Sequence, residues 1–108
     1  MDSLTPLTYE ILVALADAPK HGYGIIKEIE GRAGSGPSTG ALYLALQRME
    51  SQGLIEESTG QPEESGDARR RYWRLTGEGR DAAERESFRL ASLVAAARDK
   101  NLLAGESA

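Results

Sequence analysis

The sequence contains no cysteine among its 108 residues, and this absence excludes several kinds of site. Disulfide bonds, thiol redox sensing and cysteine-based zinc binding all require that side chain. Histidine occurs once, as His21, and no other residues follow it at the spacing of a metal site or of a general acid–base pair. We therefore expect no metal, no cofactor and no enzymatic activity.

Long apolar runs are missing as well. The longest, Ile11 to Ala16, is far too short to cross a bilayer. The opening residues Met1-Asp2-Ser3 lack the basic start and the apolar stretch of a signal peptide. The sequence thus predicts no membrane contact and a cytoplasmic location.

Positive charge is in the minority. Lysine and arginine number 13 against 17 aspartates and glutamates, a formal net charge of −4. This balance, taken alone, disfavours nucleic acid as a partner. DNA affinity depends on where the cations lie, however, and a basic patch can act within an acidic chain. The length, with 40% hydrophobic and 28% charged residues, fits one globular domain.

Two helices are predicted at the start of the chain. Thr5 and Pro6 fit the N-cap and first residue of the first helix, and Pro19 stops it. Its apolar face repeats at helical spacing through Leu7, Ile11, Leu15 and Ala18. The second helix begins near His21-Gly22 and ends in the glycine-rich stretch 31–36.

A third helix and a hairpin follow. Ser38 is the predicted N-cap of this helix and Gly53 the residue that follows its end. Its inward side consists of Leu42, Leu46 and Met49. Residues 54–57 and 70–75 resemble the strands of a hairpin, and 58–68, rich in Gly, Ser, Pro and Glu, form its long tip.

Thr76 then caps a final helix over about 77–103. The predicted fold is mainly α with a small β-hairpin. It is a winged helix-turn-helix of three helices and a two-stranded wing, plus a long C-terminal helix. We expect a DNA-binding domain over 1–76, a dimerisation helix over 77–104 and a frayed tail over 105–108.

Five short segments occur in a recognisable order and spacing: Leu4-Thr5-Pro6-Leu7, His21-Gly22-Tyr23, Gly40-Ala41-Leu42-Tyr43, Gly53-Leu54-Ile55 and Arg71-Tyr72-Trp73-Arg74-Leu75-Thr76. Along nearly its full length the chain resembles the PadR family of transcriptional regulators. It is similar to the short members, whose only addition to the winged domain is one dimer-forming helix.

Two positions depart from the family's usual pattern. Ala41 and Leu44 stand where the family commonly has threonine and proline, near the start of the third helix. Both residues favour a helix, so the fold prediction is unaffected. The operator preference of another member does not carry over to this chain.

The outward side of the third helix is the predicted DNA-reading surface. Hydroxyls, an amide and a guanidinium at a helix N-terminus suit phosphates and base edges. The predicted DNA contacts are Ser38, Thr39, Tyr43, Gln47 and Arg48, with His21 and Tyr23 from the start of the second helix. The alternative is an N-cap followed by an ordinary solvated face, with Tyr43 partly packed on the second helix and His21 serving as a cap.

The wing carries the densest group of cations: Arg69, Arg70, Arg71 and Arg74. Arginines near a wing tip can meet phosphates or enter a minor groove, which we predict for Arg69 and Arg70. The alternative is an edge strand protected by charge from aggregation, and Arg74 is a candidate for a structural role. Tyr72 and Trp73 are predicted to pack the hairpin onto the helices rather than to stack on bases.

The last helix has an apolar face broader than one winged domain can cover. The dimerisation contacts we predict are Phe88, Leu90, Ala91, Val94, Ala95 and Leu102. The alternative is that the helix folds back onto its own domain. A cavity between protomers could admit a small apolar or aromatic effector, and the resemblance suggests phenolic acids and cationic drugs as classes.

These features predict a homodimer that represses transcription from a near-palindromic operator in double-stranded DNA, with half-sites roughly 34 Å apart. A small-molecule effector would release it by preferring one of two dimer states. The competing interpretation is a winged-helix protein-interaction module without an operator of its own. The net charge favours that alternative, whereas the clustered arginines of the wing oppose it.

Overall fold

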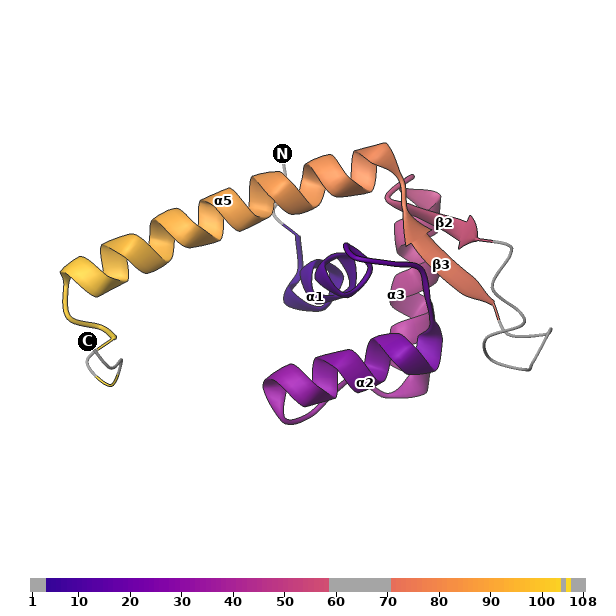
Figure 1. The fold of residues 1–108 in the computed structure, drawn as a ribbon, viewed down its shortest axis with the longest axis horizontal. Coiled ribbons are helices and arrows are strands. Elements are labelled where there is room, and N and C mark those ends of the chain that lie inside the picture. Colours follow the sequence, from indigo (N-terminus) through magenta and orange to yellow (C-terminus); the bar gives the residue numbers. More distant parts are fainter. Residues whose placement is uncertain (1–3, 59–70, 104, 106–108) are drawn as a thin grey trace.

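The computed structural model describes residues 4–58, 71–103 and 105. In chain order, the elements are α1 (Pro6–Ala14), β1 (Lys20–His21), α2 (Gly22–Ala33), α3 (Thr39–Ser51), β2 (Ile55–Ser58), β3 (Tyr72–Leu75) and α5 (Gly77–Asp99). This order confirms the predicted winged helix-turn-helix with a long C-terminal helix (Figure 1). No helix in the described ranges combines the length and the apolarity needed to span a membrane.

Three helices begin where short polar side chains cap them. The hydroxyl oxygens of Thr5, Ser38 and Thr76 each accept a hydrogen bond from the backbone N–H three residues ahead, at 3.2, 3.1 and 3.0 Å respectively. Each of these bonds satisfies one of the amide groups that a helix start leaves without an intrahelical partner. The predicted caps are therefore confirmed.

The end of α1 differs from the prediction. The helix stops at Ala14, about one turn before Pro19. The Lys20 Nζ donates to the Ala14 carbonyl oxygen at 2.6 Å and to the Asp17 carboxylate at 2.6 Å. The ammonium group thus satisfies a carbonyl that another helical turn would have used.

The wing is a three-stranded antiparallel sheet in the order β1-β3-β2, one strand more than predicted. Lys20 pairs with Trp73 and His21 with Tyr72, so the segment before α2 adds the extra strand. On the other side of β3, Ile55 pairs with Leu75. A two-residue strand has too short a pattern to be detected in a sequence, which explains why β1 was missed.

The hydrophobic core lies where α1, α2, α3 and the sheet meet. Its members come from every one of these elements, and Trp73 is the largest. The fully buried large side chains are Trp73, Ile11, Leu12, Ile25, Leu42, Leu46, Met49 and Ile55. The predicted inward side of the third helix is confirmed, and so is the packing role of Trp73.

Helix α5 lies along α1 with its first half only. Gly79, Ala82 and Glu86 are its buried residues. The second half extends beyond the winged domain, toward the left in Figure 1. The helix ends at Asp99 rather than near Leu103, because Asn101 has a positive φ of 65° and the Leu102 N–H donates to the Ala97 carbonyl oxygen at 2.8 Å. This is the left-handed helix ending that Gly and Asn favour.

Candidate nucleic-acid interface

The N-terminal turn of α3 is open to solvent. Ser38 has extended backbone angles and uses its Oγ to accept from the Ala41 N–H, while Thr39 and Gly40 are exposed. The first turn carries no acidic residue. Its backbone amides and the positive end of the helix dipole therefore present a surface suited to a phosphate or to base acceptors.

The rest of α3 divides cleanly into two sides. The buried residues Leu42, Ala45, Leu46 and Met49 form the side toward the core. Gln47 lies on the outward side, as predicted, together with Leu44, which is 58% exposed. Leu44 was absent from the predicted contacts because hydrogen-bonding side chains guided that choice.

Tyr43 is shared between the two helices of the helix-turn-helix. A Cβ atom placed on Gly22 would lie 2.4 Å from the Tyr43 hydroxyl oxygen. The phenol therefore packs against the start of α2, which was the alternative considered for it, while 39% of the residue stays exposed.

His21 and Tyr23 flank the start of α2. The His21 Nδ1 accepts from the Gly24 N–H at 3.0 Å, so His21 is the cap of this helix. Its ring meets the Tyr72 ring edge-on, with 5.3 Å between centroids, and thereby joins α2 to the sheet. Tyr23 is 61% exposed, and the Lys27 Nζ lies 5.7 Å from the centre of its ring. This pair places an exposed aromatic ring and a cation on α2.

Arg48 lies apart from the other predicted contacts. It lines a hollow of about 700 Å³ between the start of α1, the end of α3 and α5, together with Thr5, Gln52, Arg85 and Arg89. The structure thus brings His21 and Tyr23 together and packs Tyr43 against the start of α2. Thr39 and Gln47 lie on the same helix as Tyr43, and Ser38 caps it. The structure turns Arg48 toward α5.

The described arginines of the wing are engaged within the sheet. Arg74 bonds the Glu56 carboxylate at 2.8 Å, and Arg71 bonds Glu57. The Arg71 guanidinium also lies 5.0 Å from the centre of the Trp73 ring. Arg74 therefore has the structural role considered for it. Arg69 and Arg70, the predicted wing contacts, lie outside the described residues.

The second half of α5 presents an apolar face that no other described residue buries. Phe88 is 78% exposed, and Leu102, which follows the end of the helix, is 72% exposed. The other predicted dimerisation residues, Ala91, Val94 and Ala95, are exposed, and Leu90 is half-buried. Leu93, which the spacing analysis left out, is exposed as well. The second half of α5 does not fold back onto the winged domain, contrary to the alternative considered.

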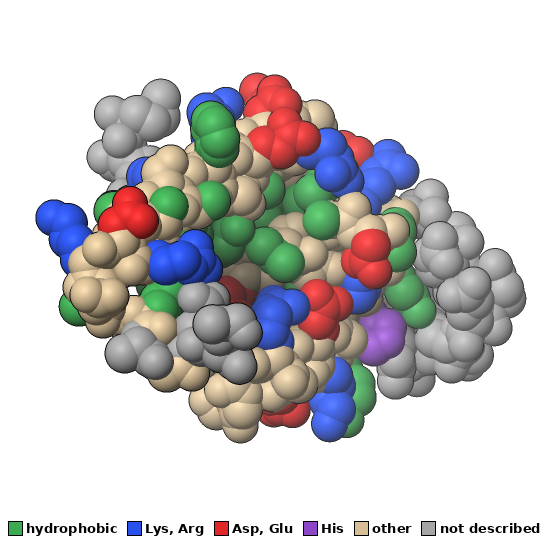
Figure 2. Space-filling view, turned by 60° about the vertical axis from the view of Figure 1, so that its left-hand side comes forward, with side chains coloured by type: hydrophobic (Ala, Val, Ile, Leu, Met, Phe, Trp, Pro, Cys, Tyr) green, Lys and Arg blue, Asp and Glu red, His purple; other side chains and the backbone are tan. Residues whose placement is uncertain are grey.

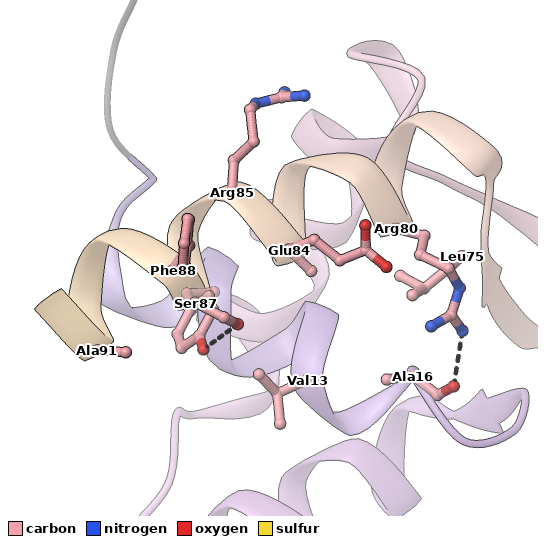
Figure 3. Close-up of a pocket in the computed structure, with 11 residues that line it drawn as sticks. Val13, Ala16, Leu75, Arg80, Glu84, Arg85, Ser87, Phe88 and Ala91 are labelled. Carbon is pink, nitrogen blue, oxygen red and sulfur yellow. Dashed lines mark hydrogen bonds between the residues drawn. The ribbon is translucent and has the colours of Figure 1, made fainter.

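An open groove of about 770 Å³ separates α1 from α5 beside this face (Figure 3). Its apolar lining includes Val13, Leu75, Ala83, Phe88 and Ala91. In the space-filling view, hydrophobic side chains surround a hollow near the middle of the face, and charged side chains surround them (Figure 2). The groove therefore continues the apolar surface of α5 toward α1 and the end of β3.

Two hydrogen bonds tie the two walls of the groove together. The hydroxyls of Tyr9 and Ser87 are 2.6 Å apart, and the Arg80 Nη2 donates to the Ala16 carbonyl oxygen at 2.8 Å (Figure 3). These bonds fix the direction of α5 relative to α1. Sequence reasoning missed them because each joins residues more than sixty positions apart.

Glu86 is a buried carboxylate: only 7% of the residue's surface is exposed to solvent. Arg89 binds it with two nitrogens, Nε at 3.1 Å and Nη2 at 2.6 Å. The hydrogen bond from Arg89 lowers the pKa of Glu86, although burial opposes the shift. The pair lies beside Arg48 in the second hollow, so this wall of the molecule is predominantly cationic.

Comparison with known proteins identifies the family to which the chain belongs. The model of the transcriptional regulator PadR-like family matches residues 11–85. A PadR family transcription regulator from Clostridium difficile R20291 has a similar crystal structure, with a TM-score of 0.77 and 30% identity over 88% of this chain and 97% of that one. A PadR-like transcriptional regulator from Bacillus cereus gives a TM-score of 0.70 and 26% identity over 93% of both chains.

A curated relative is longer. An uncharacterized 37.1 kDa protein in transposon Tn4556 of Streptomyces fradiae is 42% identical over 83 residues. The match covers 77% of this chain, which spans only 22% of that protein.

Proposed function

The chain belongs to the PadR-like family of transcriptional regulators, and on that premise we propose that it is a homodimeric repressor of a near-palindromic operator, released by a small apolar or aromatic effector. The observation that carries the proposal is that α3 and α5 expose two surfaces of different chemical character. The outward side of α3 is exposed and polar at its start, whereas the far half of α5 is exposed and apolar.

DNA contact is assigned to the start of the helix-turn-helix. Ser38 and Thr39 offer hydroxyls and backbone amides to phosphates, and Gln47 offers an amide to a base edge. Tyr23, with Lys27 beside it, and His21 extend this surface to α2. Arg48 and the wing residues Arg69 and Arg70 supply charge at the flanks, which a chain of net charge −4 needs in order to bind a polyanion.

Dimerisation is assigned to α5. Apolar side chains such as Phe88, Leu93 and Val94 are seldom left so exposed over adjoining turns of one helix unless a partner covers them. The groove between α1 and α5 gives an apolar surface against which the helix of a second copy can pack. Small residues such as Ala91 and Ala95 on this face permit close helix approach.

The effector is assigned to the same region. The groove volume of about 770 Å³ is within the range of small-molecule sites, and its lining is mostly apolar. Any ligand that changes how α5 lies against α1 acts on the Tyr9–Ser87 bond and so on the distance between the two recognition helices. Such a ligand regulates only if it binds the two dimer states with different affinity.

Selection of bound duplexes from a random library tests the proposal. We expect enrichment of an inverted repeat whose half-sites are about one helical turn apart, with two chains bound per duplex. Enrichment of no sequence, together with specific capture of a protein partner, would favour the interaction-module alternative instead. A fully dimeric protein bound to a single, non-repeated site would contradict the operator geometry.

A further inference from the structure

We propose that Leu44 is a specificity-determining residue, which packs against the 5-methyl group of a thymine in the major groove. The inference rests on the proposed binding of an operator by α3. It adds an apolar readout to the polar contacts already assigned.

The buried side of α3 defines where Leu44 points. Leu42, Ala45, Leu46 and Met49 face the core, and at about 100° per residue the direction opposite to their mean passes through Gly40, Leu44 and Gln47. Tyr43 leans to one side, against Gly22, and Arg48 to the other, toward α5. Leu44 is thus the large side chain at the centre of the outward side, and it is 58% exposed.

The turn before Leu44 leaves room for a close approach. Gly40 has no side chain, and a Cβ atom added there would meet nothing within 4 Å. Ala41 beside it carries only a methyl group. A helix with such a bare first turn can enter the groove until its first bulky outward residue meets the base edges, and that residue is Leu44.

The chemistry of the groove then selects the contact. An isobutyl group offers no hydrogen bond, so burying it against a base amino group or carbonyl oxygen would remove water from that group without replacing its hydrogen bond. The thymine 5-methyl is the one apolar group on the major-groove edges of the four base pairs. Gln47, three residues further on, is suited to an adjacent adenine. A step containing A·T pairs therefore fits both side chains.

The test uses the enriched duplex and replaces each thymine of a half-site in turn by deoxyuridine, which removes only the methyl group. For the full chain we expect one thymine per half-site at which the replacement weakens binding about fourfold, the effect of burying one methyl-sized group. Leu44→Ala should bind thymine and deoxyuridine duplexes equally at that position. Gln47→Ala is the matched control, which should bind more weakly yet keep the fourfold preference.

Thermal unfolding followed by circular dichroism checks that Leu44→Ala is folded, as expected for an exposed position. The proposal is overturned if no thymine position responds to removal of its methyl group, or if Leu44→Ala keeps the full preference. Either result leaves operator binding intact, because the duplex was enriched. Failure to enrich any duplex would instead overturn the proposed function.

Discussion

The phenol of Tyr43 lies over Gly22, with its hydroxyl oxygen 2.4 Å and its Cζ 2.8 Å from the position that a Cβ atom on residue 22 would take. A side chain on residue 22 would collide with the phenol, so Tyr43 can keep this position only while residue 22 is glycine. This contact joins the two helices that carry the proposed DNA contacts.

Gly22→Ala should lower the free energy of unfolding by about 1–3 kcal/mol, the usual effect of forcing an extra methyl group into a packed contact. It should also weaken DNA binding, because Tyr43 and the start of α2 must move apart. Urea denaturation and a binding titration measure the two effects. Gly31→Ala is the control, since Gly31 lies in the same helix with nothing within 4 Å of an added Cβ. We expect Gly31→Ala to stabilise the protein by about 0.5–1 kcal/mol.

Phe88→Glu should produce a monomer. The side chain is 78% exposed in the single chain, so its replacement should change the stability of one protomer by less than about 0.5 kcal/mol. A charge buried at the α5 interface would prevent association, and affinity for a two-site operator should fall with it. Sedimentation equilibrium gives the mass. Leu44→Glu, the same kind of change on α3, should leave the dimer intact while abolishing DNA binding, and a dimeric Phe88→Glu protein would refute this role of α5.

The Glu86–Arg89 pair predicts a pH dependence of stability. The hydrogen bond from Arg89 holds the pKa of Glu86 below its ordinary value of 4.5 in the folded protein. A lowered pKa means that the pair stabilises the fold fully above about pH 4.5, the value expected in the unfolded chain, and that this contribution is lost as the pH falls through the lower folded value. The stability difference between the wild type and Glu86→Gln should shrink over that range.

Denaturation of both proteins at a series of pH values measures this difference. Asp17, whose pKa Lys20 also lowers, titrates in both proteins and cancels in the comparison. A difference that stayed constant down to pH 3 would mean that the charge of Glu86 contributes nothing to stability.

Replacing Arg69 and Arg70 by alanine should weaken binding to all duplexes and reduce the slope of log K against log salt concentration by about one for each phosphate that an arginine no longer neutralises. Arg74→Ala is the control. Its guanidinium bonds Glu56 across the hairpin, and an exposed ion pair of this kind contributes less than about 1 kcal/mol to stability. We expect its salt slope to match that of the wild type. A double variant with an unchanged slope would exclude phosphate contact by this part of the wing.

Features set by neighbouring residues could be predicted from the sequence. Thr5, Ser38 and Thr76 cap helices through bonds that span three residues, and Gly53 ends α3 with a positive φ of 79°, so each signal lies within one helical turn. The inward side of α3 followed from apolar spacing in the same way. Asn101 carried a comparable local signal, which was overlooked in favour of the apolar residues after it.

Features that depend on distant segments could not be predicted. Strand β1 exists because Lys20 and His21 meet β3, some fifty residues later in the chain. The direction of Arg48 depends on where α5 lies, and the direction of α5 depends on Ser87 reaching Tyr9. Helical periodicity placed Arg48 outside the core correctly, but it could not distinguish the side toward the start of α2 from the side toward α5.

Insertion of five base pairs between the two half-sites of the enriched operator tests the central claim most directly, namely that one dimer places two α3 helices in successive major grooves. The insertion turns one half-site by about half a helical turn. We predict that affinity falls to that of a duplex carrying a single half-site, while binding to the uninterrupted operator survives competitor DNA. Equal affinity for the two duplexes would contradict the account, because it would mean that the two recognition helices do not act as a fixed pair.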